Sequence, residues 1–287
     1  MSPEIANNPA DRQPVIRVVD LVKRFDSRTV LDGVDLEIYP GETMVIMGGS
    51  GCGKSTLLQH MIGSQWPNEG HVELFGQNLS LLEDEALDET RKRFGVLFQS
   101  GALFNSMTVG ENVALPLREH TDLDDDTIDI MVRIKLEQVG LRYAVDLMPA
   151  QISGGMKKRA GLARALALDP EILFYDEPSA GLDPVTSARI DELMSGLARK
   201  LGITSVVVTH EMDSAFHIAD RMAMLDKGRI LKVAPRQDFE AIRDGGPAAD
   251  ETTNTIRQFL RGDSEGPITD RGLGDGYAED ILGAAGG

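Results

Sequence analysis

The chain has 287 residues, of which 41% are hydrophobic and 26% charged. This length and balance suit one or two globular domains and exclude collagen-like and wholly disordered chains. The formal net charge of −17 disfavours a broad surface for nucleic-acid phosphates, so we expect no nucleic-acid partner. The single cysteine, Cys52, excludes an internal disulfide and any metal site with several cysteine ligands.

The uninterrupted apolar runs are too short to cross a bilayer. Met44–Met47 and Ile172–Tyr175 are four residues long, whereas a spanning helix needs ~20. We therefore expect no membrane-spanning segment. Residues 1–14 are polar, contain three prolines and lack the pattern of a secretory signal, so we expect a polar N-terminal tail.

The strand patterns change along the chain. Val15–Val19 and Val34–Ile38 alternate apolar and polar residues, which predicts half-buried strands of a small antiparallel layer. Later strands are short and nearly all apolar, as buried parallel strands are. These predicted strands are Met44–Met47, Phe94–Phe98, Ile172–Tyr175, Ser205–Val208 and Met222–Leu225. The sequence thus predicts an α/β fold with a parallel core sheet.

A helical insertion interrupts this pattern between Gln99 and about Leu168. Apolar residues there recur at helical spacing from Ile128 to Val139. The aspartate-rich stretch before them fits a solvated helix start better than a cation site. From Gly262 onward the chain is rich in glycine and acidic residues, so both a disordered tail and a partner-dependent arm stay open.

A complete GxxxxGKS motif lies directly after the first apolar strand and before a potential helix. It comprises Gly48, Gly49, Ser50, Gly51, Cys52, Gly53, Lys54 and Ser55, with Thr56 next in the nucleotide-binding set. Glycines let the backbone approach phosphates, Lys54 can meet the outer phosphates, and Ser55 can ligate Mg²⁺. The alternative, a glycine-rich turn with a chance match, is weakened by the correct flanks.

Two carboxylates, Asp176 and Glu177, end the apolar strand at residues 172–175. Beside Lys54 and Ser55, Asp176 would hold Mg²⁺ and Glu177 would reach the water that attacks the γ-phosphate. An acidic turn at the end of a strand is the alternative. A second glycine-bearing helix start, Ser153-Gly154-Gly155-Met156, also offers N–H groups to an anion, although an ordinary serine cap explains it in isolation.

In motif order, the region from about Val15 to about Ala234 resembles the ATP-binding cassette (ABC) ATPases. The corresponding motifs are Walker A at Gly48–Ser55, the Q-loop at Gln99, the signature at Ile152–Met156, Walker B at Ile172–Glu177, the D-loop at Asp176–Asp183 and the H-loop at Val206–His210. The signature departs from the usual LSGGQ at Ile152 and Met156. The resemblance implies a RecA-like core, an antiparallel β subdomain and an inserted helical subdomain.

The resemblance also implies a homodimer in which each ATP lies between Walker A of one subunit and the signature of the other. Ser153 and Gly155 would serve the partner's γ-phosphate, and Glu177 would be the general base. His210 would contact the γ-phosphate. Gln99 would sense Mg²⁺ and Asp183 would connect the two sites.

Phe25 and His210 each have a second, structural interpretation. Phe25 lies where the family places an aromatic residue that stacks on adenine, but it could equally be a core residue. His210 ends a buried strand, where a structural histidine would be the default without the surrounding motifs.

Finer stretches, such as Leu97–Phe104 and Pro116–Thr121, resemble the ATPases of the Mla (maintenance of lipid asymmetry) phospholipid transporters and their Mce-associated relatives. This resemblance implies a peripheral ATPase dimer on the cytoplasmic face of a bacterial inner membrane. Its partners would be a permease dimer, a periplasmic MCE lipid-binding ring and a small cytoplasmic accessory subunit. Another ABC importer, a lipoprotein-release system and a soluble non-transport ABC ATPase remain alternatives.

Three parts of the chain are expected. The polar tail spans residues 1–14, the ATPase domain 15–245 with its helical subdomain at about 100–165, and a C-terminal extension 246–287. By resemblance, the extension would contact the neighbouring subunit, anchored by Tyr277, Ile281 and Leu282.

Overall fold

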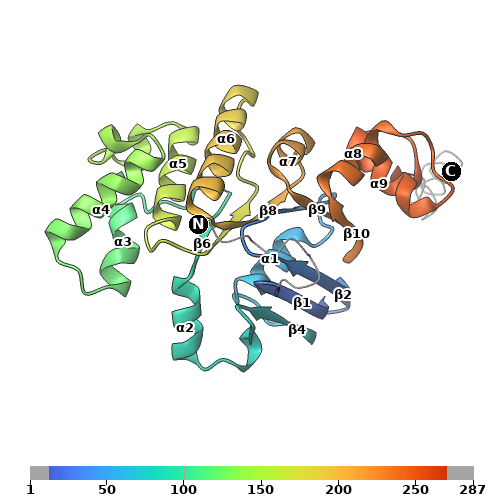
Figure 1. Ribbon diagram of the computed structural model, residues 1–287, viewed down its shortest axis with the longest axis horizontal. Coiled ribbons are helices and arrows are strands. Elements are labelled where there is room, and N and C mark those ends of the chain that lie inside the picture. The colour runs from blue at the N-terminus through green and yellow to red at the C-terminus, as the bar shows by residue number, and fades with distance from the viewer. Residues whose placement is uncertain (1–12, 100, 270–287) are drawn as a thin grey trace, which may run out of the picture.

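The computed structural model describes residues 13–99 and 101–269, in which helices surround two β-sheets (Figure 1). The strands are β1 (Ile16–Phe25), β2 (Arg28–Ile38), β3 (Thr43–Met47), β4 (Glu69–Leu74), β5 (Gln77–Asn78), β6 (Phe94–Leu97), β7 (Ile172–Asp176), β8 (Thr204–Thr209), β9 (Arg221–Asp226) and β10 (Arg229–Pro235). The α-helices are α1 (Lys54–Met61), α2 (Asp84–Lys92), α3 (Val109–His120), α4 (Asp125–Gln138), α5 (Gly154–Ala165), α6 (Pro184–Leu201), α7 (Met212–Ile218), α8 (Arg236–Asp244) and α9 (Glu251–Arg261). Short 3₁₀ helices cover Leu79–Leu81, Arg142–Ala144 and Pro149–Gln151.

The smaller sheet is antiparallel, with strand order β2-β1-β4-β5. Both predicted strands are present and extend further than the alternating pattern indicated, because a tight turn at Asp26 (φ 51°) places Phe25 opposite Arg28. The sequence pattern did not predict β4, in which only two of six residues are buried. Pairing with β1 selects this segment as a strand.

The larger sheet has strand order β10-β9-β3-β8-β7-β6, and only β10 runs antiparallel to its neighbour. All five predicted apolar segments are strands of this sheet. The order places β3 beside β8 and β8 beside β7, so the loops after these three strands lie at one edge. The predicted α/β fold class is therefore confirmed.

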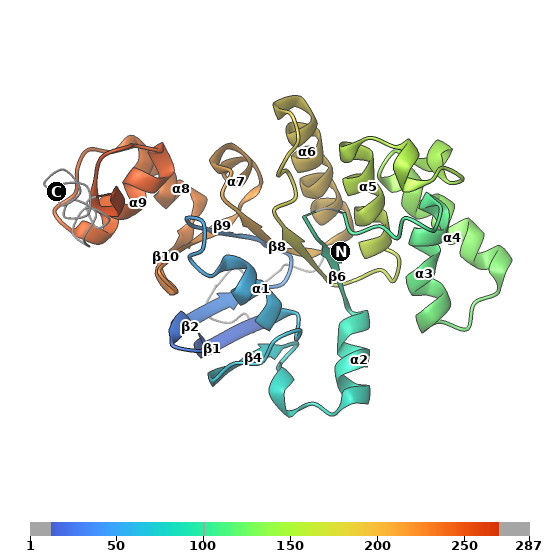
Figure 2. The ribbon, with the colours of Figure 1, turned by 180° about the vertical axis from the view of Figure 1, so that it is seen from behind.

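The two faces of the larger sheet face two apolar clusters, because successive side chains of a strand point to opposite faces. Met44 and Ile46 pack with α1 and the smaller sheet, whereas Val45 and Met47 pack with the helices on the other face. Figure 2 shows α5, α6 and α7 on the side of the larger sheet away from β1 and β4. The core thus runs on both sides of the strands that position the site.

The helical insertion contains α3, α4 and α5, which contact one another. Thr108 begins α3 with a capping box to Glu111, and Asp124 caps α4 by accepting from the Thr127 N–H at 2.9 Å. The aspartate-rich stretch is therefore a helix start, as its composition favoured. Within residues 13–99 and 101–269, no helix combines the length and apolar composition that a membrane crossing requires.

The C-terminal helices α8 and α9 pack on each other and on the larger sheet's helical side. Phe239, Ile256 and Leu260 are at most 5% exposed and belong to the same apolar cluster as Val45. The apolar cluster thus continues past residue 245. The division into an ATPase domain that ends at residue 245 and an extension that begins at residue 246 stays a proposal. Tyr277, Ile281 and Leu282 lie outside the described residues.

Candidate nucleotide-binding and hydrolysis site

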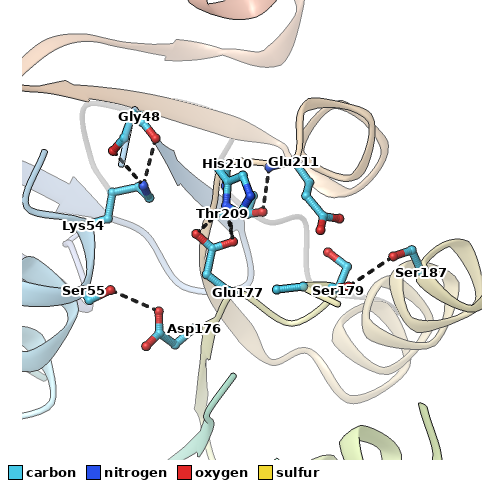
Figure 3. Close-up of polar contacts among 12 residues, drawn as sticks. Gly48, Lys54, Ser55, Asp176, Glu177, Ser179, Ser187, Thr209, His210 and Glu211 are labelled. Atoms are coloured by element: carbon cyan, nitrogen blue, oxygen red, sulfur yellow. Dashed lines mark hydrogen bonds and ion pairs between the residues drawn. The ribbon is translucent and has the colours of Figure 1, made fainter. Parts of the chain in front are cut away.

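The loop between β3 and α1 wraps closely around its own backbone. Gly53 precedes α1 with φ 113°, a conformation that favours glycine. A Cβ at Gly48 would lie 2.1 Å from the Leu225 carbonyl oxygen, so only glycine fits there. The Lys54 Nζ donates to the carbonyl oxygens of Gly48 and Gly49 at 2.8 and 3.1 Å (Figure 3). The glycine pattern therefore forms a tight loop before a helix start, as its spacing predicts, and the N–H groups there can hold phosphates.

The first carboxylate of Walker B lies opposite this loop. The Ser55 hydroxyl donates to Asp176 Oδ1 at 3.4 Å (Figure 3), although these residues are far apart in the sequence. Burial, and then the neighbouring Glu177 carboxylate, raise the pKa of Asp176. The partly buried Asp176 carboxylate and the Ser55 hydroxyl therefore form a pair of oxygen ligands of the kind that Mg²⁺ prefers.

The second carboxylate faces the end of β8. His210 Nδ1 lies 2.9 Å from the Glu177 carboxylate, and Figure 3 shows the two side chains pointing toward each other. The Glu177 backbone N–H donates to the Val208 carbonyl at 2.9 Å. Glu177 has φ 50°, which is strained for a residue with a side chain and costs ~1–3 kcal/mol. The fold thus holds this carboxylate in a defined place beside the histidine.

A cavity of about 670 Å³ is lined by the loop before α1, Glu177 and His210, whereas Asp176 is not among its lining residues. Residues of the predicted set that line it are Gly49, Ser50, Gly51, Gly53, Lys54, Ser55, Thr56, Gln99, Glu177 and His210. Gly48 and Cys52 are buried, and the Cys52 N–H donates to the Gly49 carbonyl at 3.3 Å. Three further lining residues were not expected from the sequence: Arg28, Val30 and Phe259. Arg28 and Val30 lie in β2 before the alternating segment Val34–Ile38, and no local pattern marks Phe259 as part of the site.

Phe25 is not a core residue. It ends β1 with 44% of its surface exposed, and the Lys23 ammonium lies 5.1 Å from the centre of its ring. This exposure leaves an aromatic face available to a planar ligand. Phe25 is outside the set of residues that line the cavity.

The signature residues lie away from this cavity. Ser153 caps α5 by accepting from the Met156 N–H at 3.3 Å, and Gly154 is exposed at the helix start. Ser153, Gly155 and Met156 line a second cavity of about 530 Å³, against α6. A single chain therefore does not bring them to Lys54.

Asp183 begins α6. Its carboxylate accepts from the backbone N–H groups of Val185 and Thr186 at 3.1 and 3.0 Å. The hydrogen bonds from Thr186 hold the pKa of Asp183 below its ordinary value. Asp183 is exposed, and its loop follows directly from Glu177.

This combination of a phosphate loop, a Walker B strand and a histidine at the end of the intervening strand defines an ATP-hydrolysing P-loop protein of the cassette class. The family model described as "ABC transporter" matches residues 31–180. The chain belongs to the ABC transporter family and is an ATP-binding, ATP-hydrolysing cassette.

Relatives cover nearly the whole chain. It is 38% identical, over 94% of its length and 99% of the relative, to the intermembrane phospholipid transport system ATP-binding protein MlaF of Haemophilus influenzae. It is 41% identical, over 88% of its length and 70% of the relative, to the Mycobacterium leprae protein named probable ribonucleotide transport ATP-binding protein mkl. Among solved structures, a dimer of the ATP-binding cassette MJ0796 bound to ADP and Pi superposes with a TM-score of 0.71. That match has 30% identity and covers 77% of this chain and 98% of the other.

Proposed function

We propose that this chain is the ATPase subunit of an inner-membrane transporter that moves phospholipid between the inner and outer membranes. The observation that carries the hydrolytic part is one cavity lined by Lys54, Gln99, Glu177 and His210. The lipid part is supported by the likeness to MlaF over 99% of that relative's length. ATP would be the substrate and transport the work done.

In the proposed chemistry, the N–H groups of residues 48–55 bind the phosphates and the Lys54 ammonium moves from its carbonyl acceptors to the outer phosphates. Glu177 takes a proton from the attacking water. His210 contacts the γ-phosphate and orients the water together with Glu177, to which it is already adjacent. Phe25 would stack on adenine through its exposed ring.

Mg²⁺ would be bound by Ser55 and Asp176, with Gln99 lining the same cavity as Ser55. The oxygen donors and the 3.4 Å contact between Ser55 and Asp176 fit this ion. When bound, Mg²⁺ would neutralise charge on the β- and γ-phosphates. The bound ion would also reduce the electrostatic repulsion between the Asp176 and Glu177 carboxylates.

The separation of the signature from Lys54 within one chain supports a homodimer. In a two-fold pair, Ser153, Gly154, Gly155 and Met156 of one subunit would complete the ATP site of the other. Asp183, on the loop that follows Glu177, would lie between the two sites. The dimeric MJ0796 cassette shows that a related chain assembles in pairs.

A second groove suits the permease. A cavity of about 440 Å³ lies among α2, β6, α3 and α5, lined among others by Phe98, Pro116 and Arg164. Nearby, Phe104 is 52% exposed, whereas Leu103 is partly buried against the core. A groove lined by both apolar side chains and charged ones, such as Asp88 and Arg91, would receive a helix from a membrane partner. The permease dimer would connect this chain to a periplasmic MCE ring, and a small accessory subunit could join on the cytoplasmic face.

Affinity purification from detergent-solubilised membranes tests the proposal. We expect a permease and an MCE protein to be recovered with an ATPase activity that Glu177→Gln lowers by roughly 10²–10⁴-fold. The relative named for ribonucleotide transport makes a different transported solute the second candidate. A permease recovered without an MCE protein would favour that candidate or a lipoprotein-release system. A dimer recovered only with ribosomes or DNA would overturn transport.

A further inference from the structure

A buried lysine on α5 contacts the turn that carries Glu177. Lys158 is 5% exposed, and its Nζ donates to the carbonyl oxygens of Glu177 and Ala180 at 3.2 and 2.8 Å. The Ala180 N–H also donates to the Glu177 carbonyl at 3.2 Å. One ammonium therefore binds both ends of the turn from Glu177 to Ala180.

This turn needs external support. The φ of 50° at Glu177 is sparsely populated by residues other than glycine, and such a conformation persists only where the surroundings enforce it. The core sheet supplies two contacts, the Val208 carbonyl at the Glu177 N–H and His210 at its carboxylate. Lys158 supplies a contact from the helical insertion, on the carbonyl side of the same residue.

Breaking the hydrogen bonds between Lys158 and the turn would cost free energy. Burial lowers the pKa of Lys158, an effect that the nearby Glu211 and Glu177 carboxylates oppose. If α5 moved away from the turn, the buried ammonium would lose both acceptors and two carbonyl groups would lose a donor. The position of α5 and the backbone of Glu177 are thus coupled.

The same helix is in close contact with α6. A Cβ at Gly155 would lie 2.6 Å from Thr186 Cγ2, so the start of α5 and the start of α6 approach each other closely. The turn held by Lys158 leads directly into the loop that begins α6. A shift at the signature residues would therefore reach the turn by two routes, through Lys158 and through Thr186.

We propose that Lys158 is a positioning residue for ATP hydrolysis. It fixes the backbone of Glu177 so that the carboxylate stays beside His210, and it makes this placement depend on the helix that begins with the signature residues. The inference rests on the proposed role of Glu177 as general base. Lys158 itself would touch no phosphate.

The test uses the full-length chain with Lys158→Met, which keeps an unbranched side chain but removes the donor. We expect kcat for ATP hydrolysis to fall ~10- to 100-fold while KM and the affinity for a fluorescent ATP analogue change less than ~3-fold. Lys158→Gln, which keeps a neutral donor, should recover part of the rate. Lys157→Met, at the preceding position on α5, should stay within ~2-fold of the parent.

A double-mutant cycle with Glu177→Gln separates positioning from general stability. In the Glu177→Gln background, Lys158→Met should cause no further loss of single-turnover rate, because the group it positions is already gone. Additive losses, or an unchanged kcat in Lys158→Met, would overturn the inference. If Lys158→Met does not fold, the Lys158→Gln cycle decides by the same criterion. Normal turnover in Glu177→Gln alone would instead refute the general-base role.

Discussion

Several functional groups at the residue scale are held by backbone atoms rather than by other side chains. Lys54 and Lys158 are both buried lysines whose ammonium groups donate to backbone carbonyls. Carbonyl acceptors offset the cost of burying charge without fixing the lysine in an ion pair. Lys54 can therefore exchange its acceptors for phosphate oxygens, whereas Lys158 stays with the turn.

Glu177→Gln should retain ATP binding while hydrolysis falls by roughly 10²–10⁴-fold, because glutamine cannot accept the proton of the attacking water. Single-turnover hydrolysis and binding of a fluorescent ATP analogue measure the two effects separately. Lys54→Ala is the matched contrast, since it should weaken nucleotide binding itself. Near-normal turnover in Glu177→Gln would remove Glu177 as the base.

Asp191 makes stability depend on pH. Its side chain is 4% exposed, it accepts a hydrogen bond from the Ser214 hydroxyl at 2.7 Å, and burial raises its pKa. Because the folded-state pKa is the higher one, the folded protein binds this proton more tightly, and stability is lost as pH rises from the unfolded pKa through the folded pKa. Asp191→Asn should therefore increase the free energy of unfolding at neutral pH.

Urea unfolding from about pH 4 to about pH 8 measures this effect. The advantage of Asp191→Asn should shrink toward the acidic end, where the folded parent protein protonates this carboxyl. Glu192→Gln removes the same charge at the next, exposed position of α6 and should show little of this dependence. A neutral-pH stability of Asp191→Asn at or below that of the parent would contradict the argument.

At the scale of elements, β6 and the end of α5 approach each other only because one residue lacks a side chain. A Cβ at Gly95 would lie 2.1 Å from the Ala165 carbonyl oxygen and 2.8 Å from Leu173 Cδ2. Gly95→Ala should lower the free energy of unfolding by roughly 1–3 kcal/mol, as overpacking of a core does. Denaturant unfolding provides the measurement.

Gly196 is a control with the opposite expected sign. It lies within α6, and a Cβ there would meet nothing within 4 Å. Gly196→Ala should stabilise the protein by about 0.4–1 kcal/mol, because alanine loses less entropy in a helix. If Gly95→Ala were as stable as the parent, the close contact between β6 and α5 would not be a constraint on the fold.

At the scale of the whole molecule, removal of the segment after Thr269 tests whether the C-terminal extension contacts the neighbouring subunit. The described structure folds residues up to Thr269 back on α9, where Gln258 Nε2 donates to Thr269 Oγ1 at 3.2 Å and the Ile268 N–H donates to Gln258 Oε1 at 2.7 Å. A cut after Thr269 therefore leaves these contacts in place. We expect it to weaken dimerisation and ATPase activity if Tyr277, Ile281 and Leu282 anchor the arm on a partner.

Light scattering coupled to size-exclusion chromatography, with an ATPase assay on the same samples, measures both properties. Replacing the three apolar residues by alanine should reproduce the truncation, whereas replacing the acidic Asp275 and Glu279 should have little effect. An intact dimer with full activity after the cut would favour a tail without an intersubunit role.

Predictability from sequence differs between the two sheets for a physical reason. The strands of the larger sheet are buried on both faces, so their continuous apolar runs are visible without the fold. β10 escaped prediction because most of its residues are only partly buried, and β4 because a glycine and two glutamates obscure its alternation. The role of Lys158 was not predicted because a lysine on a helix is ordinarily exposed, and because its hydrogen-bond acceptors lie in a turn that is distant in the sequence.

The sequence by itself determined the phosphate loop and the Walker B carboxylates, because their chemistry depends on neighbours within one strand, one loop and one helix start. Only the tertiary structure decided which distant groups meet. Strand order brings His210 beside Glu177 and Ser55 near Asp176, and it leaves Ser153 apart from Lys54. Such contacts follow from the packing of the whole core, since no local spacing encodes the distance between residues on separate strands.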